Sequence, residues 1–362
     1  MFNKEQKIIL SMVSGTIEEM CLSILTQITE KEVIKISFFC DAMNNDVYLQ
    51  NIATLKDAVS RFYPTDTPLV SYIAQESYTG KLVAEVLFLK DSHTAIERHR
   101  NYIVLKSDCC TELLTGCIIP DDTSKSTYEQ SCNIFNGINK LLQSHGFKPN
   151  DIYRQWNYIQ GITTMHDGSQ NYQEFNDARS IFYNTCSWEN GYPAATGIGT
   201  GAGGVMVEIN AIRGCAVNKP IDNPLQVAAH SYSQEVLDGK TIADLDKRTT
   251  PKFERARLLG NTIYISGTAA IKGETSLNSN NILEQTAETM LIMDRLVSKE
   301  NIPTTNNGSH YLLLRVYIKN SEDIEVVKEF MENHYPAAAK HYLIADVCRP
   351  ELLVEIEGVA HI

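Results

Sequence analysis

The same order of predicted strands and helices occurs twice in the last two thirds of this 362-residue chain. Apolar patterns with a period of two indicate strands, and patterns with a period of 3.6 indicate helices. The first copy has strands at Tyr102–Lys106, Leu113–Ile119, Ile152–Ile159 and Gly204–Ile212 and helices at Tyr128–Ser144 and Tyr172–Tyr183. The second copy has strands at Thr262–Ala269, His310–Ile318 and Tyr342–Val359 and helices at Asn281–Val297 and Glu322–Asn333. A repeated order of this kind predicts an internally duplicated α+β chain.

The last strands of the two copies align residue by residue, with Glu208 opposite Glu355. The N-terminal third matches the repeat poorly. Its predicted elements are strands at Val33–Cys40, Leu69–Ala74 and Leu82–Leu89 and a helix at Val47–Phe62. We therefore expect three parts, which are an N-terminal α/β region that could be a degenerate module (1–95), a first module (96–220) and a second module (221–362).

Composition narrows the class of protein. With 32 Lys and Arg against 44 Asp and Glu, the net charge of -12 argues against a nucleic-acid partner. No apolar run suits a signal peptide or a membrane span. The nine cysteines include no Cys-x-x-Cys, and the nine histidines include no metal-binding pair, so we expect reduced thiols, no metal and a cytoplasmic location.

Gly199–Gly204 satisfies the G-x-G-x-x-G pattern of dinucleotide sites, but the residues that follow it predict a strand. A dinucleotide site needs a helix at that point, because the helix N-terminus holds the pyrophosphate. We therefore expect a tight loop here and no cofactor.

Two glutamates in the last predicted strand are the main candidates for chemistry. Glu355 and Glu357 lie on one face of the strand, while Leu352, Val354 and Ile356 take the other. A second carboxylate and apolar neighbours both raise the pKa of a glutamate, which suits a general acid. Paired glutamates on an exposed strand are also a common solubilising feature, and composition alone favours that reading.

Several segments, in the same order along the chain, resemble the chorismatases, enzymes of the RidA/YjgF-like superfamily that cleave the enolpyruvyl ether of chorismate. They are Arg154–Ile159, Tyr172–Arg179, Pro193–Gly199, Asn223–Val227, Ser266–Ala269 and the C-terminal strand. The resemblance implies RidA/YjgF-like (chorismate-mutase-like) modules. RidA-type proteins are trimers with sites between subunits, so a fused pair of modules plus the N-terminal third predicts a pseudo-trimeric core in a monomer.

The resemblance also implies roles for individual residues. Glu355 would donate a proton to the methylene carbon of chorismate, and the product would be pyruvate with 3-hydroxybenzoate or a dihydroxycyclohexadiene carboxylate. Cys348 resembles the 3-hydroxybenzoate-forming branch, and we expect the guanidinium of Arg349 to lower the pKa of its thiol. The expected substrate-binding residues are Arg154, Arg179, Tyr232, Arg255, Thr268, Ala269, Ala270 and Lys340.

Two alternatives stay open. The first is a RidA-like enamine or imine hydrolase, which Lys340 disfavours because the imine deaminases carry an arginine there. The second is a non-catalytic member that binds an aromatic or carboxylate ligand. Two departures from the chorismatase pattern, an arginine displaced to Arg248 and a histidine at His230, support the second alternative.

Overall fold

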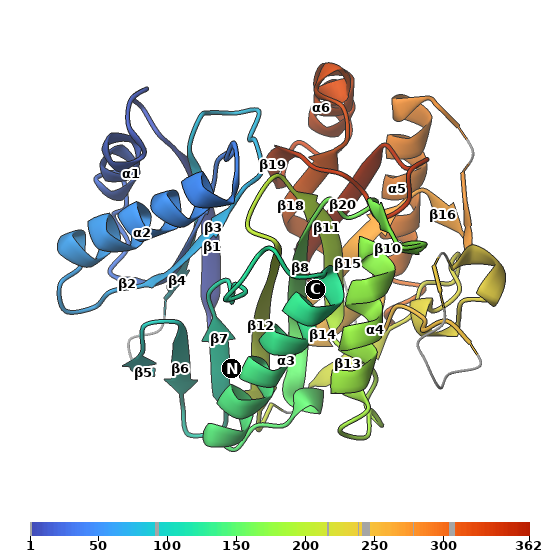
Figure 1. The fold of residues 1–362 in the computed structure, drawn as a ribbon, viewed down its shortest axis with the longest axis horizontal. Coiled ribbons are helices and arrows are strands. Elements are labelled where there is room, and N and C mark those ends of the chain that lie inside the picture. Colours follow the sequence, from blue (N-terminus) through green and yellow to red (C-terminus); the bar gives the residue numbers. More distant parts are fainter. Residues whose placement is uncertain are drawn as a thin grey trace.

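The computed structural model describes residues 2–90, 94–215, 217–237, 239–240, 247–277, 279–303 and 308–362. The chain forms three larger sheets, and a pair of helices packs against each of them (Figure 1). We call the three sheet-and-helix assemblies the N-terminal, middle and C-terminal units.

The N-terminal unit has a four-stranded sheet in the order β1-β4-β2-β3. Its elements are β1 (Lys4–Leu10), α1 (Ile17–Leu25), β2 (Glu32–Phe39), α2 (Asn45–Phe62), β3 (Leu69–Ile73) and β4 (Val83–Leu89).

The middle unit has a six-stranded sheet in the order β11-β8-β12-β7-β6-β5. Its elements are β5 (Ala95–Arg98), β6 (Tyr102–Lys106), β7 (Thr111–Thr115), α3 (Thr127–Ser144), β8 (Ile152–Gln160), α4 (Asn171–Tyr183), β11 (Ala194–Thr200) and β12 (Val205–Arg213). A short hairpin of β9 (Met165–His166) and β10 (Ser169–Gln170) precedes α4.

The C-terminal unit has a six-stranded sheet in the order β13-β14-β15-β20-β18-β19. Its elements are β13 (Asn218–Ile221), β14 (Ala256–Leu259), β15 (Thr262–Ala269), α5 (Ile282–Val297), β18 (His310–Ile318), α6 (Ile324–His334), β19 (Ala339–Ile344) and β20 (Val354–His361). The hairpin of β16 (Ile271–Lys272) and β17 (Thr275–Ser276) follows β15.

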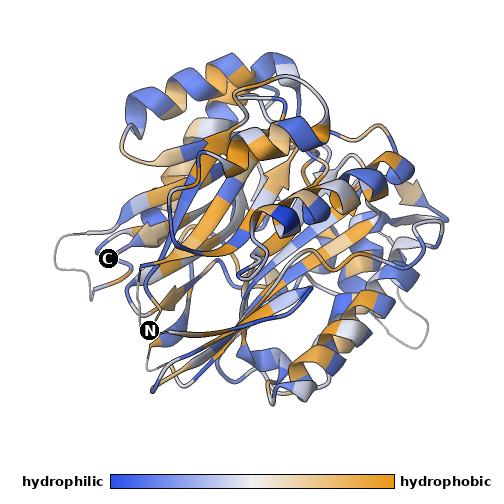
Figure 2. Ribbon diagram, turned by 90° about the vertical axis from the view of Figure 1, so that its left-hand side faces the viewer, coloured by the Kyte–Doolittle hydropathy of each residue, from blue (hydrophilic) through white to orange (hydrophobic). Residues whose placement is uncertain are grey.

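Local sequence explains where the helices begin. Thr16 with Glu19 and Ser126 with Glu129 form capping boxes at the starts of α1 and α3, and the Asn281 side chain caps α5. Behind the caps, apolar residues face the sheets, and the central strands are mostly hydrophobic while the helices alternate between polar and apolar faces (Figure 2). The predicted helices and most predicted strands are thus confirmed to within a few residues.

All three units share one connectivity. In each, four strands and two helices follow the order strand, helix, strand, helix, strand, strand, and the second and last strands pair side by side. The prediction of an internal duplication is confirmed, and the N-terminal third has this connectivity although its sequence matches the repeat poorly. That third lacks only the outer strands that extend the other two sheets, which is why its sequence pattern is shorter.

Strand register corrects the alignment of the glutamates. Glu85 pairs with Ser37, Glu208 with Trp156 and Glu357 with Arg315, each at the same point of the second and last strands. Glu208 therefore corresponds to Glu357, and the predicted match to Glu355 is wrong by two residues. The residues that correspond to Glu355 are Met206 and Val83, which are both apolar.

Three buried ion pairs join the units in a cycle. Lys35 of the N-terminal unit binds Glu208 of the middle unit at 2.6 Å, and Arg154 of the middle unit binds Glu357 of the C-terminal unit. Arg315 of the C-terminal unit closes the cycle at Glu85, 2.6 Å away. We call these six residues the inter-unit ring.

Trp156 lies at the centre of the inter-unit ring. The charged ends of its three cations, Lys35, Arg154 and Arg315, lie 5.5, 4.5 and 5.7 Å from the indole centroid. The predicted pseudo-trimeric core is therefore present within a single chain. Cation–π contact and paired charges both lower the cost of burying these groups.

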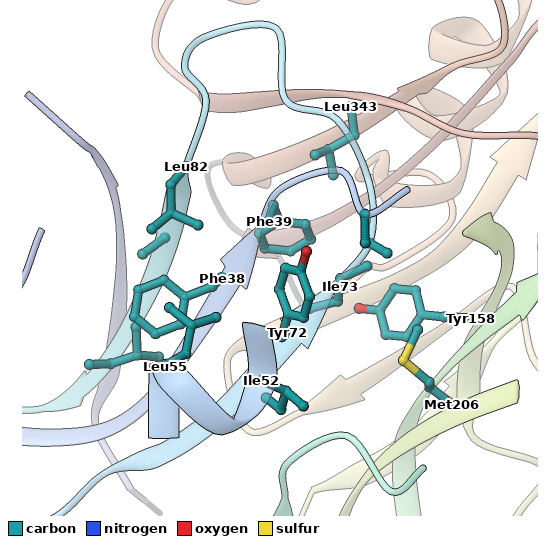
Figure 3. Close-up of a cluster of buried hydrophobic side chains, with 14 of the residues drawn as sticks. Phe38, Phe39, Ile52, Leu55, Tyr72, Ile73, Leu82, Tyr158, Met206 and Leu343 are labelled. Carbon is teal, nitrogen blue, oxygen red and sulfur yellow. The ribbon is translucent and has the colours of Figure 1, made fainter. Parts of the chain in front are cut away.

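Apolar contacts also cross the unit boundaries. Figure 3 shows Tyr158 and Met206 of the middle unit and Leu343 of the C-terminal unit packed with residues of the N-terminal unit, among them Tyr72. The phenol of Tyr48 donates to the Met206 sulfur and its ring stacks on that of Tyr72. Met206 corresponds to Glu355, so side chains fill the boundary between the N-terminal and middle units at the position that the Glu355 carboxyl group has at the next boundary.

Candidate active site

One pocket lies at the boundary between the middle and C-terminal units. The middle unit contributes the face of α4 and the strand β11, and the C-terminal unit contributes β15, β20 and the loops beside them. The lining residues are Gln170, Tyr172, Gln173, Asn176, Arg179, Ala195, Gly197, Tyr232, Val236, Leu237, Pro251, Phe253, Arg255, Gly267, Ala269, Ile271, Cys348, Arg349 and Glu355.

Glu355 lies on the floor of this pocket. Its strand residue pairs with Ala269 on one side and Tyr317 on the other, and the residue is only 5% exposed. Burial and the neighbouring Glu357 carboxylate raise its pKa to about 8, and Arg255 opposes them. The carboxyl group is therefore protonated at neutral pH, as a general acid requires. The reading of the two glutamates as exposed solubilising charges is wrong, since Glu357 is 3% exposed.

Gly267 makes room for the Glu355 carboxyl group. A Cβ atom on this residue would lie 2.9 Å from the carboxyl carbon of Glu355 and 3.0 Å from the Thr196 methyl carbon, and closer still to Oε1. The amide of Gly267 donates to the hydroxyl of Thr196 at 3.0 Å, which fixes β15 against β11. Gly197 has a similar role on the opposite wall, where its missing side chain is replaced by the ring of Tyr172.

Glu357 stands behind Glu355, outside the pocket lining. Five donors hold its carboxylate, namely Arg154 Nη2, Thr196 Oγ1, Trp156 Nε1, Arg315 Nη1 and the Tyr317 hydroxyl. This network fixes a charged group beside the candidate acid without placing that charge in the pocket.

Two arginines of the lining are open to a ligand. Arg179 donates to Asn176 Oδ1 at 2.6 Å, and Arg255 donates to the Tyr232 hydroxyl and the Val227 carbonyl oxygen, each at 2.7 Å. In the described part of the chain neither guanidinium is paired with a carboxylate, and the Nε atom of each is buried without a hydrogen-bond partner. Buried, unpaired guanidinium groups favour anionic ligands, and two of them suit a dicarboxylate.

Cys348 lies in the loop between β19 and β20. Burial, together with the smaller effect of Glu355, raises the pKa of its thiol to about 12, although Arg349 opposes them. Arg349 thus lowers the pKa of the thiol as expected, but the cost of burying the thiolate outweighs the nearby cation, so the thiol is neutral at pH 7. The guanidinium of Arg349 donates to the Glu274 carbonyl oxygen and the Ser276 hydroxyl and lies over the Tyr232 ring.

The structure brings together six of the ten predicted site residues and separates four from the pocket. The six are Glu355, Cys348, Arg179, Tyr232, Arg255 and Ala269. Arg154 supports Glu357 instead, Thr268 donates to the Ser266 carbonyl oxygen, and Ala270 is fully buried behind the lining. Lys340 is occupied by Glu332 and by the carbonyl oxygens of Tyr335 and Ala338.

Sequence reasoning missed several lining residues. Tyr172, Gln173 and Asn176 lie in the segment that resembles the chorismatases, so the helical spacing from Arg179 was a usable signal. Leu237 and Phe253 come from the long connection between β13 and β14, where no periodicity indicated a direction. Residues 245 and 246, beside the displaced arginine, lie outside the described residues.

The two departures lie at the edge of the site. Arg248 donates to the carbonyl oxygens of Gly239 and Gln234 and so braces the loop that carries Tyr232. His230 lies 3.8 Å from Glu254, a residue that also accepts from the Tyr192 amide. Neither residue is part of the pocket lining.

Among the described residues, no group of three or more His, Cys, Asp or Glu is placed to hold a metal ion. No described helix is long and apolar enough to cross a membrane. Gly201–Gly204 form the turn between β11 and β12, so a strand follows the glycine-rich segment as predicted.

Comparison with known proteins identifies the family of the chain. Residues 89–211 match the family model described as "Chorismatase FkbO/Hyg5-like, N-terminal", and residues 247–362 match the model described as "Endoribonuclease L-PSP". A chorismatase of Streptomyces rapamycinicus is 31% identical over 247 residues, which cover 62% of this chain and 68% of that protein. The chain belongs to the chorismatase family. The family predicted from the motifs is thereby confirmed.

A 3-hydroxybenzoate synthase of Streptomyces hygroscopicus is 30% identical over 228 residues, which cover 61% of this chain and 66% of that protein. The chain thus spans about two thirds of the length of the curated relatives it matches. The crystal structure of a chorismatase, at 21% identity, superimposes with a TM-score of 0.75 over 99% of this chain and 98% of that one, which confirms the predicted fold.

Proposed function

We propose that the protein is an enzyme that cleaves the enolpyruvyl ether of chorismate and releases pyruvate. The observation that carries this proposal is the buried carboxyl group of Glu355, which is protonated at neutral pH and faces a pocket with two unpaired arginines. Chorismate carries two carboxylates, which match Arg179 and Arg255, and an enol ether, which is cleaved by protonation at carbon.

In the first step, Glu355 transfers its proton to the terminal methylene carbon, and the ether oxygen stabilises the resulting cation. Capture by one water molecule gives pyruvate and the dihydroxycyclohexadiene carboxylate. Loss of one water molecule from the ring gives 3-hydroxybenzoate, so the route from chorismate to pyruvate and 3-hydroxybenzoate has no net consumption of water. No oxidant or cofactor is needed for this balance.

We propose 3-hydroxybenzoate as a main product because Cys348 lies in the same pocket as Glu355. The thiol starts neutral, and its proton can pass to the Glu355 carboxylate that the first step leaves behind. The sulfur then displaces the ring hydroxyl group next to the former ether carbon, and that hydroxyl leaves as water with the proton held by Glu355. Loss of the proton on the former ether carbon makes the ring aromatic and breaks the carbon–sulfur bond, and the sulfur leaves as a thiol with that proton. The cysteine returns to its initial state, so this sequence is catalytic.

The experiment is to incubate the purified chain with chorismate and measure pyruvate by coupling to lactate dehydrogenase, with chromatography of the aromatic product. We expect turnover by the wild type and a loss of about 100-fold or more in Glu355→Gln, the scale of a general acid. A wild type that binds chorismate but releases no pyruvate would support the non-catalytic alternative and overturn the proposal.

We further propose a monomer in the cytoplasm, with domain boundaries near residues 95 and 220. A monomer is supported by the three units, which supply each other's contacts within one chain. The cytoplasm is supported by the sequence, whose nine cysteines include no Cys-x-x-Cys, as is usual for thiols that stay reduced there. The boundaries are supported by β5 and β13, which open the sheets of the middle and C-terminal units.

A further inference from the structure

The inter-unit ring connects the pocket to the N-terminal unit, which contributes no residue to the pocket lining. The connection runs through Arg315, whose guanidinium touches two carboxylates at once. Its Nε and Nη2 atoms bind Glu85 at 2.6 to 3.0 Å, and its Nη1 atom binds Glu357 Oε1 at 3.0 Å. Glu357 in turn lies two residues from Glu355 on the same face of β20.

From this chain of contacts we propose that Glu85 is a positioning residue for the reaction, acting on the proton donor Glu355 through Arg315 and Glu357. The inference rests on the proposed function of Glu355. It assigns a role to the N-terminal unit, namely to complete the charge balance behind the pocket.

The effect of Glu85 on Glu355 is electrostatic. The six residues of the inter-unit ring carry three negative and three positive charges, all buried. The Glu357 carboxylate favours the protonated form of Glu355, and a guanidinium beside Glu357 weakens that effect. Glu85 accepts hydrogen bonds from Nε and Nη2, two of the three guanidinium nitrogen atoms of Arg315. Its negative charge therefore offsets much of the positive charge that would otherwise act on Glu357.

Glu85 itself is permanently charged. Although burial alone would raise its pKa, Arg315 and His341 lower it to about 2. Its other neighbours are Gln6, which donates to it from β1, and His341, which contacts both Glu85 and Ser77.

A substitution at Glu85 changes none of the other charged or titratable groups around the pocket. Facing Glu355 are Arg255 and the thiol of Cys348, and Tyr172 lies across the pocket. Facing Glu357 are Arg154, Arg315 and the phenol of Tyr317. The contacts that lead from Glu85 to the pocket run through Arg315 and Glu357.

The test is the pH profile of kcat/KM for pyruvate release in the full-length Glu85→Gln variant. Without the negative charge of Glu85, the positive charge of Arg315 acts mainly on Glu357 and weakens the effect by which Glu357 raises the pKa of Glu355. The basic limb of the profile is therefore expected to move to lower pH by about one unit. At pH 8 this lowers activity about fivefold. Glu85→Asp keeps the charge and should restore the wild-type limb.

Glu112→Gln is the matched control. Glu112 is equally buried, pairs with Lys4 of the N-terminal unit and accepts from the Tyr153 hydroxyl, but it lies outside the inter-unit ring. The basic limb of the pH profile of Glu112→Gln should stay at the wild-type position. Equal shifts in the two variants, or no shift in Glu85→Gln, would overturn the inference.

Direct titration of the Glu355 carboxyl by carbon-13 NMR separates this inference from the proposed function. Its midpoint should fall in Glu85→Gln whether or not chorismate is the substrate, with Glu355→Gln used to assign the signal. If Glu85→Gln does not fold, Glu85→Met removes the same charge with a side chain suited to burial, and the same shift is expected. An unchanged midpoint refutes the role of Glu85, whereas a wild type without pyruvate release refutes only the function.

Discussion

Replacing Gly267 with alanine tests whether the position of the Glu355 carboxyl group controls turnover. The added methyl carbon would lie 2.9 Å from the carboxyl carbon of Glu355, whereas carbon atoms in contact are about 3.5 to 4.0 Å apart. The carboxyl group must therefore move by roughly 1 Å, because Thr196 blocks the methyl on the other side. A displacement of this size at a reacting group costs about 100-fold in rate, or about 2.7 kcal/mol of transition-state stabilisation.

The assay is steady-state pyruvate release, with the melting temperature measured in parallel. The loss should appear in kcat, since Arg179 and Arg255, the proposed ligands of the substrate carboxylates, are unchanged. Gly137→Ala is the control, because a methyl group on this residue of α3 meets no atom within 4 Å. A Gly267→Ala enzyme whose kcat is within threefold of the wild type would show that the reasoning about the carboxyl position is wrong.

Three further outcomes are expected. Because the acid form of Glu355 is needed and its pKa is about 8, wild-type kcat/KM should be level below pH 8 and fall about tenfold per unit above it; a profile level to pH 10 would contradict this assignment. Cys348→Ala should retain pyruvate release but shift the product toward the dihydrodiol, as followed by chromatography, and an unchanged product ratio would reduce Cys348 to a packing residue. Arg179→Met should raise the KM for chorismate about 10-fold or more with a smaller change in kcat, whereas an unchanged KM in steady-state assays would exclude a contact with the substrate.

The features that the sequence predicted well are those that depend on nearby residues. Alternation along one strand was enough to put Glu355 beside Glu357, and helical spacing was enough to place Arg179 on a sheet-facing helix. The roles of individual arginines could not be predicted, because they depend on partners far along the chain. Arg154 and Arg179 both lie in segments that resemble the family. Only the fold, which brings Glu357 to Arg154 from 203 residues away, shows that Arg154 supports Glu357 while Arg179 lines the pocket.

The register of the duplicated strands was out of reach for a related reason. Sequence alignment matched the glutamates of the two last strands by their apolar neighbours, which favoured Glu355. In the structure, Glu208 and Glu357 each form an ion pair with a cation of the preceding unit, so these two residues correspond. Burial of the Cys348 loop could not be anticipated either, and it is this burial that makes the thiol a weak acid.

The correspondence of Val83, Met206 and Glu355 has a consequence for how such a site can change over time. In a symmetric homotrimer one substitution appears at every interface, so a site cannot be lost at one boundary and kept at another. Joining the three units in one polypeptide removes that constraint. Two boundaries can then have an apolar residue at this position, such as Met206, which packs against Tyr48, while the third boundary has the acid Glu355. The chain combines the assembly of a trimer with the evolutionary freedom of three separate interfaces.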